Sequence, residues 1–167
     1  MKYIFEWDFN KAKTNINKHQ VSFEDATTVF KDKNMISIFD EKHSEDEERW
    51  ITIGMDINTR TLVVVHTFVS IDKDNTKIRI ISARKATKNE KKSIGRTKME
   101  KEYDFSNGIR GKFYNKDAEF QLPIYLEPEI ENFFKNIAQK QKTNLNNIVN
   151  KLLLKDKELL EVASLRG

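Results

Sequence analysis

Several features that would define the class of protein are missing from this 167-residue sequence. It has no cysteine, which excludes disulfide bonds and thiolate metal ligands. It has no apolar run as long as a membrane-spanning helix or the hydrophobic region of a signal peptide requires. Its three histidines are far apart and form no i, i+4 pair. We therefore expect a cytoplasmic protein with no membrane contact, no metal site and no cofactor.

Proline and glycine are also scarce, and the mean hydropathy of −0.69 is low. A composition with 34% charged residues approaches that of disordered chains. Eleven phenylalanines, two tryptophans and clear apolar periodicity indicate instead that the chain buries a core.

Charge and sequence divide the chain into unlike parts. Residues 1–98 contain 19 Lys and Arg against 15 Asp and Glu, whereas residues 99–167 contain eleven of each. The stretch that begins at Met99 also reads like the opening of a second protein. We expect a domain at 1–98, an extended arm at 99–117 and a module at 118–167. So small a module cannot easily bury a core alone, which predicts a dimer.

Apolar periodicity predicts an α+β domain in residues 1–98. Asp8, Ser22 and Thr87 each stand where a helix N-cap is expected. Period-two alternation in the middle of the domain predicts an antiparallel sheet of about four strands. The expected elements are a strand at 3–7, helices at 9–19 and 23–30, strands at 35–39, 51–57, 62–69 and 77–83, and a helix from residue 88.

The arm at 99–117 has little periodicity. After it we expect a strand at 118–126, a helix from Pro128 to about residue 141 and a second helix from about 144 to 162. One strand cannot pair within its own module. It must therefore add to another sheet or pair with a second copy of itself.

The stretch FQLPIYLEPEIENFFKNIAQKQKTNLNNIVNKLLLKD, residues 120–156, resembles the ribbon-helix-helix family of DNA-binding proteins. The resemblance implies a homodimer held by the 118–126 ribbon and the C-terminal helices, with the ribbon in the major groove of operator DNA. It also implies that Leu122, Ile124 and Leu126 face the core of that dimer. The residues expected to bind DNA are Gln121, Pro123 and Tyr125 on the ribbon, and Thr143 and Asn144 at a phosphate-binding helix start.

Four blocks in the first domain carry a second resemblance: FEWD at 5–8, KHQVSFEDATTVF at 18–30, HSEDEERWITIG at 43–54 and IRIISARKATKNE at 78–90. Together with Lys11 and Asn15 they resemble the BrnT family of bacterial toxins. That resemblance implies a RelE-like fold, with an antiparallel sheet and helices, and metal-independent cleavage of messenger RNA. BrnT toxins pair with BrnA antitoxins, which carry a ribbon-helix-helix domain. The chain thus resembles a toxin fused to its antitoxin.

Metal-independent RNA cleavage needs a base for the ribose 2′-OH and cations for the charge that gathers on the phosphate. His19 has a suitable intrinsic pKa for proton transfer. The residues expected at the catalytic site are His19, Lys18, Arg49 and Arg84. The residues expected to bind RNA are Arg79, Lys85 and Trp50, the last by base stacking. Strand alternation along 78–84 predicts that Arg79 lies on the face opposite to four of its neighbours: Ile78, Ile80, Ser82 and Arg84.

Simpler roles are open for three of these residues. His19 closes a predicted helix and so can serve as a C-cap partner. Arg49 follows the acidic run 45–48 and can be a solvated neighbour of those carboxylates. Trp50 can belong to the core or to a subunit contact.

Two functions remain open. In the first, the chain is a self-inhibited endoribonuclease whose arm crosses the basic face of residues 1–98, with Glu102 and Asp104 placed to meet Arg or Lys. In the second, the catalytic function is idle and the chain is a dimeric DNA-binding transcriptional regulator.

Overall fold

The computed structural model describes residues 1–44, 47–93 and 103–164 of the chain. It contains two compact units, Met1–Pro123 and Ile124–Gly167. Residues 103–123, which are expected to belong to the arm and to the start of the second module, group with the first unit.

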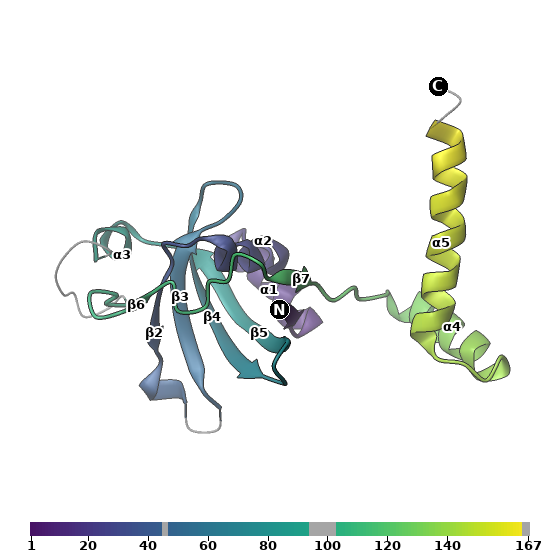
Figure 1. Cartoon of the computed structure of the whole chain (residues 1–167), viewed down its shortest axis with the longest axis horizontal. Helices are drawn as coiled ribbons and strands as arrows, with labels where there is room; N and C mark the ends of the chain where they lie inside the picture. Colours follow the sequence, from purple (N-terminus) through teal and green to yellow (C-terminus); the bar gives the residue numbers. More distant parts are fainter. Residues whose placement is uncertain (45–46, 94–102, 165–167) are drawn as a thin grey trace. The chain divides into compact units, whose positions relative to one another are not determined.

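The first unit is built around a seven-stranded sheet in the order β6-β2-β3-β4-β5-β1-β7 (Figure 1). Its strands are β1 (Lys2–Glu6), β2 (Ile36–Phe39), β3 (Arg49–Met55), β4 (Thr61–Ser70), β5 (Asn75–Lys85), β6 (Ile109–Arg110) and β7 (Glu119–Gln121). Its helices are α1 (Phe9–His19), α2 (Phe23–Thr27) and α3 (Lys88–Ser93), with 3₁₀ turns η1 (Thr28–Lys31) and η2 (Glu41–His43). The predicted mixed α+β class is confirmed.

The four middle strands, β2 to β5, form the antiparallel meander that the alternating pattern predicts. The prediction of an antiparallel sheet of about four strands is confirmed for this meander, but the whole sheet is larger and is not wholly antiparallel. β1 pairs in parallel with β5, from Lys2 opposite Asn75 to Glu6 opposite Arg79, and β6 and β7 extend the two outer edges. Periodicity identifies a strand, but long-range packing sets its partner and direction.

The helix starts predicted from capping residues are confirmed. Asp8 and Ser22 each accept a hydrogen bond from the backbone N–H three residues further on, at 2.8 and 3.0 Å. Thr87 and Glu90 form a reciprocal capping box, in which each backbone N–H donates to the other side chain, at 3.0 and 3.2 Å.

Two clusters of buried side chains lie on opposite faces of the sheet. The helix-covered face packs against α1, α2 and η1, and its core includes Tyr3, Phe5, Phe23, Phe30, Val64 and Ile80. The opposite face, called the arginine face below, has a smaller core made of Ile36, Ile51, Ile53, Val63, Ala86 and Phe105.

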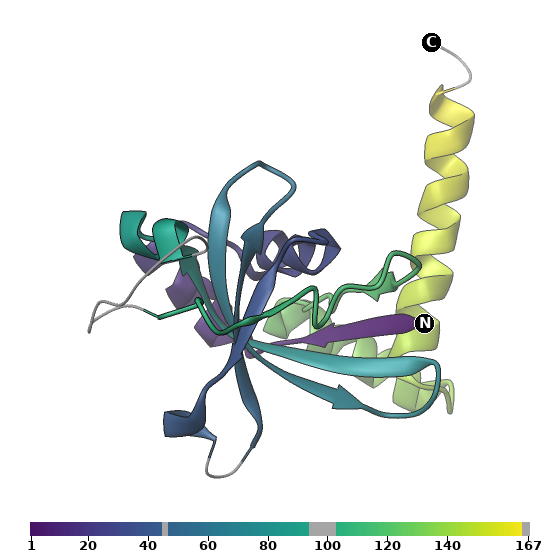
Figure 2. The ribbon, with the colours of Figure 1, turned by 60° about the vertical axis from the view of Figure 1, so that its left-hand side comes forward.

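Residues 103–121, called the wrapping segment below, contact both faces and both edges of this sheet. Phe105 is 1% exposed in the core of the arginine face, and Phe113 is 4% exposed in the core of the helix-covered face. β6 pairs with β2, and β7 pairs with β1. In Figure 2 this green segment runs across the sheet from the side of β2 to the side of β1. The segment is therefore part of the fold of the first unit.

Two glycines allow the wrapping segment to approach the sheet closely. A Cβ atom at Gly108 would lie 2.3 Å from Ile36 Cγ2, so no larger side chain fits there without movement. Gly111 has φ of +64°, and its N–H donates to the Met35 carbonyl at 2.7 Å.

The prediction of one strand from 118 to 126 is wrong in its length. β7 covers only Glu119–Gln121 and pairs in parallel with β1, so it adds to the sheet of its own chain. Pro123 follows two residues later and has no N–H to continue a ladder. Of the two possibilities for this strand, addition to another sheet and pairing with a second copy, the structure shows the first.

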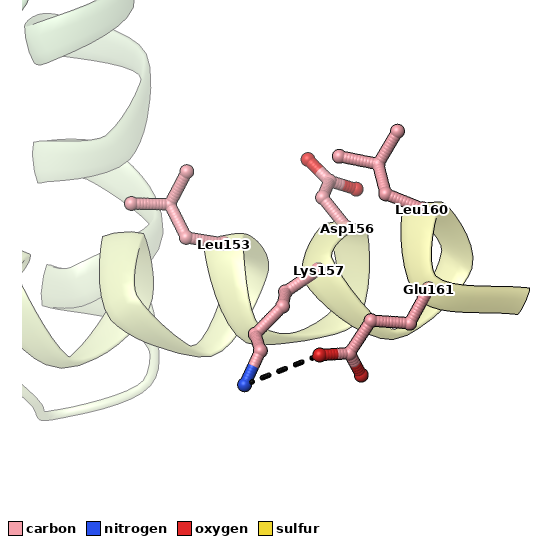
Figure 3. A pocket seen from close by; sticks show the side chains of 5 residues that line it. All are labelled: Leu153, Asp156, Lys157, Leu160 and Glu161. Atoms are coloured by element: carbon pink, nitrogen blue, oxygen red, sulfur yellow. Dashed lines mark ion pairs between the residues drawn. The ribbon is translucent and has the colours of Figure 1, made fainter. Parts of the chain in front are cut away.

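The second unit consists of α4 (Pro128–Lys140) and α5 (Leu145–Ser164), as predicted. Within its described residues, Ala138 is the only buried hydrophobic residue. Large apolar side chains are exposed on both helices: Ile130, Phe133, Leu152, Leu153, Leu154, Leu159 and Leu160. Figure 3 shows an open depression on α5, lined by Leu153, Asp156, Lys157, Leu160 and Glu161. A single copy of this unit therefore buries almost no core.

The longest helix, α5, has 20 residues and carries charged side chains along its length. Among the helices in the described ranges, none combines the length and the apolar character needed to cross a membrane.

Candidate active site

The end of β5 lies beside α1, and this contact brings several predicted residues together. The pairing of β1 with β5 stops at Arg79, and beyond it Asn15 of α1 meets the strand. The Asn15 amide nitrogen donates to the carbonyls of Val21 and Ala83 at 2.9 and 2.8 Å, and its amide oxygen accepts the Ala83 N–H at 3.1 Å. Asn15 is 6% exposed, so these bonds are shielded from water. They fix the end of α1 against β5.

His19 is the last residue of α1 and is partly buried. Burial lowers the pKa of its imidazole, and the positive charges of Lys18 and Arg84 lower it further. An imidazole with a pKa below its usual 6.5 is mostly neutral at pH 7, so it is suited to accept a proton. Gln20 follows in the left-handed conformation with φ of 55°, and its N–H closes the helix on the Ile16 carbonyl at 2.8 Å.

Arg84 is held by a buried carboxylate. Its Nη1 and Nη2 atoms donate to the two oxygens of Glu90 at 2.8 and 2.6 Å, and the Glu90 side chain is fully buried. Burial by itself raises the pKa of Glu90. The hydrogen bonds from Arg84 and from the backbone N–H groups of Thr87 and Tyr103, together with the Arg84 charge, bring that pKa below its usual value. Such a two-bond pair fixes the plane of the guanidinium.

The wrapping segment reaches this pair directly. The Tyr103 backbone N–H donates to Glu90 at 3.4 Å, and the Arg84 guanidinium lies 5.6 Å from the centre of the Tyr103 ring. Of the two acidic residues expected to meet cations, Glu102 lies outside the described residues. The other, Asp104, accepts the Ser106 N–H at 3.0 Å.

The prediction that Arg79 lies opposite Ile78 and Ile80 is confirmed, because both isoleucines belong to the core of the helix-covered face. The prediction that it lies opposite Ser82 and Arg84 is wrong. The pairing register between β4 and β5 shifts next to Val65, because His66 pairs with Ile80 while Val65 pairs with Ser82. The extra residue of β5 at this shift is a β-bulge, which reverses the side-chain alternation beyond it. Arg79, Ser82 and Arg84 all lie on the arginine face as a result.

A second group of charges lies at the other end of the same strands. Arg49 of β3 and Arg79 of β5 both pair with Thr67 of β4, so they flank it on the arginine face. Glu47 connects the two arginines. One carboxylate oxygen lies 3.2 Å from Arg49 Nε and 3.1 Å from Arg49 Nη2, and the other forms an ion pair with Arg79 Nη2.

The structure therefore places five of the predicted residues in two groups. The histidine group consists of Lys18, His19 and Arg84, and the arginine pair consists of Arg49 and Arg79. The β4 partners of Arg79 and Arg84 are Thr67 and Val63, four residues apart. At the usual rise of a strand, this places the two groups ~13 Å apart along the sheet.

Trp50 and Lys85 lie outside both groups. The Trp50 ring packs edge to face against Phe39 and Phe113, each at 5.2 Å between ring centres, and Lys112 Nζ lies 4.4 Å from its centre. This position is on the helix-covered face. Lys85 is exposed at the end of β5, directly after Arg84.

The residues predicted to bind DNA are divided between the two units. Gln121 ends β7 and Pro123 ends the first unit, whereas Tyr125, Thr143 and Asn144 belong to the second. Asn144 precedes α5, and its side-chain oxygen accepts the N–H three residues further on at 2.8 Å. Thr143 Oγ1 accepts a hydrogen bond from a side-chain amide in the same turn at 3.2 Å.

Two of the three residues expected in the core of a ribbon dimer are exposed in the single chain. Leu122 and Ile124 have 41% and 81% of their surface accessible. Leu126 is half-buried.

The remaining histidines lie apart from these groups. His66 is fully buried, with Nε2 2.8 Å from Thr52 Oγ1 and Nδ1 3.3 Å from the Thr67 carbonyl. Burial lowers the pKa of His66 to about 3, against a smaller opposing effect of the bond to Thr67. His43 lies 3.0 Å from Asp40. In the described part of the chain, no three His, Asp or Glu side chains gather as a metal site requires.

Sequence reasoning missed the roles of three polar residues. Glu90 stands three residues after the N-cap Thr87 and Glu47 lies in the acidic run 45–48, yet each binds an arginine of a candidate group. Asn15 enters the sequence analysis only through the family resemblance, yet its hydrogen bonds hold α1 against β5. One signal was present for Glu90, since a carboxylate six residues after Arg84 can fold back across a strand-to-helix turn.

Comparisons with known proteins identify the family to which this chain belongs. A family model described as the ribonuclease toxin BrnT of type II toxin–antitoxin systems matches residues 7–90, half of the chain, and this range contains both cationic groups. The chain is also similar to the 1.1 Å crystal structure of the Brucella abortus ribonuclease toxin BrnT, with 24% identity and a TM-score of 0.36 over 53% of this chain and 99% of that one. No curated protein matches the chain. On the strength of the family model, the chain belongs to the BrnT family of ribonuclease toxins of type II toxin–antitoxin systems.

Proposed function

We propose that the first unit is a metal-independent endoribonuclease with a RelE-like fold, that it cleaves RNA at the histidine group, and that the wrapping segment restrains it. One observation carries the proposal: a His19 imidazole with a lowered pKa lies close enough to Lys18 and Arg84 to feel both charges. Membership of a ribonuclease toxin family supports the same reaction.

In the proposed reaction, the neutral His19 imidazole takes the proton of a ribose 2′-OH, and the 2′ oxygen attacks the adjacent phosphorus. The bond from phosphorus to the 5′ oxygen breaks, leaving a 2′,3′-cyclic phosphate and a 5′-OH. Arg84 stabilises the charge that gathers on the phosphate oxygens. Lys18 adds to this charge stabilisation and gives a proton to the departing 5′ oxygen.

Glu90 and Tyr103 connect this reaction to the proposed restraint. Glu90 fixes Arg84 from the buried side, and the Tyr103 ring lies over the same guanidinium. Phe105, two residues further on, is anchored in the core of the arginine face. The wrapping segment would therefore have to shift for a phosphate to approach Arg84 from the side of Tyr103.

RNA cleavage by the full chain tests the reaction. A labelled single-stranded RNA should be cut slowly, and the fragments should end in a 2′,3′-cyclic phosphate. His19→Ala and Arg84→Ala should abolish cleavage, whereas Lys88→Ala, which removes one exposed positive charge nearby, should leave the rate nearly unchanged. If the His19→Ala protein cuts RNA as fast as the unchanged chain, the assignment of the base is wrong.

For the second unit we propose a BrnA-like ribbon-helix-helix module that forms a homodimer and binds operator DNA, so that the chain is a toxin fused to an antitoxin. The exposed apolar side chains of α4 and α5 support a dimer. β7 is the last strand in the described sheet, so its outer edge can pair with a second copy. Sedimentation tests this: Phe133→Asp should give a monomer, and the neighbouring Asn136→Asp should not.

The alternative is a catalytically idle, dimeric DNA-binding transcriptional regulator. The pairing of Arg49, Arg79 and Arg84 with carboxylates favours it, because paired cations bind RNA less readily. Gel shifts with the DNA upstream of the coding sequence separate the two functions. DNA binding that is lost in Gln121→Ala and Tyr125→Ala, without RNA cleavage by the full chain, would support the alternative.

A further inference from the structure

The arginine pair and Glu47 form a charged cluster that the proposed reaction does not use. Both guanidinium groups lie on the arginine face on either side of Thr67, and both reach the Glu47 carboxylate. The side chains of Arg49, Arg79 and Glu47 are 32%, 40% and 29% exposed. The cluster is therefore accessible to a solute.

The charges within this cluster do not cancel. Two guanidinium groups meet one carboxylate, which leaves one positive charge. Guanidinium groups offer planar sets of N–H donors that match phosphate oxygens as well as carboxylate oxygens. Glu47 thus occupies the position that an anionic ligand would take between Arg49 and Arg79.

We propose that Arg49 and Arg79 bind one phosphodiester group of single-stranded RNA, and that Glu47 occupies this subsite until the RNA displaces it. Exposed ion pairs contribute little to stability, so RNA can displace Glu47 at small cost. Release of counterions from the RNA adds to the gain.

The position of this subsite gives it a role in the proposed function, on which the inference rests. It lies on the same face as Arg84 and ~13 Å from it along the sheet. A strand of RNA bound at both places would cross the arginine face, with the phosphate at Arg49 and Arg79 a few nucleotides from the cleaved bond. The arginine pair would therefore contribute to affinity and alignment, while the histidine group performs the reaction.

Binding of a 2′-O-methyl RNA octamer to the full chain, measured by fluorescence anisotropy, tests the subsite. This RNA has no 2′-OH and is not cleaved, so binding is measured apart from the reaction. Glu47→Gln should tighten binding by roughly threefold or more, because it removes the competing carboxylate. Glu48→Gln is the matched control, since it removes the same charge from the next, exposed residue. The control should change affinity much less.

Arg79→Gln and Arg49→Gln, each added to Glu47→Gln, complete the test. Each should reverse the gain in affinity, and each should reduce the slope of log affinity against log salt by roughly 0.7, the value for one lost phosphate contact on a single strand. Tryptophan fluorescence of each variant checks that the first unit remains folded. Equal tightening by Glu47→Gln and Glu48→Gln, or unchanged binding by the arginine variants, would overturn the subsite.

His19→Ala separates this inference from the proposed function. It should abolish cleavage of ordinary RNA, and Glu47→Gln should still tighten binding of the octamer when it is added to His19→Ala. A chain that binds the octamer through Arg49 and Arg79 but never cuts RNA would refute the proposed reaction and keep the subsite. A chain that cuts RNA with no contribution from these arginines would refute the subsite and keep the proposed reaction.

Discussion

Mild acid should destabilise the first unit through the buried His66. The pKa of this imidazole is lowered to about 3 in the folded chain. In the unfolded chain it returns to roughly 6.5. Between these two values the unfolded chain binds a proton that the folded chain does not. The free energy of unfolding therefore decreases as the pH falls below 6.5.

The size of the effect follows from the two pKa values. Each pH unit below 6.5 removes ~1.4 kcal/mol of stability. At pH 5 the folded His66 is still neutral, so the loss relative to pH 7.5 is about 2 kcal/mol. A small domain has a total stability of only ~5–15 kcal/mol, so this loss is readily measured.

Urea unfolding followed by tryptophan fluorescence measures it, because both tryptophans, Trp7 and Trp50, lie in the first unit. The comparison protein is His66→Gln, which cannot titrate but keeps an amide that can bond to Thr52. The carboxylates and the other histidines titrate in both proteins, so their contributions cancel when the two changes in unfolding free energy are compared. The unchanged chain should lose about 2 kcal/mol more than His66→Gln between pH 7.5 and pH 5. Equal losses would refute the reasoning.

Three further predictions test the fold and the site. Gln20→Gly should raise the free energy of unfolding by about 1 kcal/mol, because Gln20 has φ of 55°, a conformation that glycine adopts without strain; urea unfolding measures this. Phe113→Ala should cost the first unit about 3–5 kcal/mol in the same measurement, whereas the exposed Tyr114→Ala should have little effect. Lys18→Gln should slow cleavage by removing the proposed acid, and it should raise the pKa of His19 by removing a nearby positive charge, so the acid limb of the remaining cleavage rate should move to higher pH; an unmoved limb would argue against His19 as the base.

Local signals predicted the helices of the first unit well. Asp8 and Ser22 cap α1 and α2 because a short polar side chain before a helix bonds to the free N–H groups of its first turn. These interactions span three residues, so the sequence contains all the information they need.

Features that depend on strand pairing cannot be predicted from the local sequence in the same way. The β-bulge beside Val65 arises from how β4 and β5 align, and a period of two read along β5 alone misses it. That one shift brings Arg79 to the face that carries Arg84. The short β7 is a similar case, since its parallel partner β1 lies at the other end of the sequence.

The candidate site was predicted in part. The family resemblance implies metal-independent RNA cleavage, and the chemistry of that reaction predicts the residues of the histidine group, which Asn15 and the end of β5 bring together in space. The carboxylate partners of the arginines are harder to predict, because Glu47 and Glu90 also fit simpler roles as a solvated acid and a helix cap. Pairing with arginine across the fold is set by tertiary structure and leaves no periodic pattern in the sequence.

The single-turnover rate of RNA cleavage by full-length Tyr103→Ala tests the central claim most directly. Removal of the ring that lies over Arg84 should increase the rate above that of the unchanged chain, while Tyr114→Ala, elsewhere in the wrapping segment, should not. The increase should vanish when His19→Ala is added. A Tyr103→Ala rate no higher than that of the unchanged chain, or cleavage that persists without His19, would contradict the account.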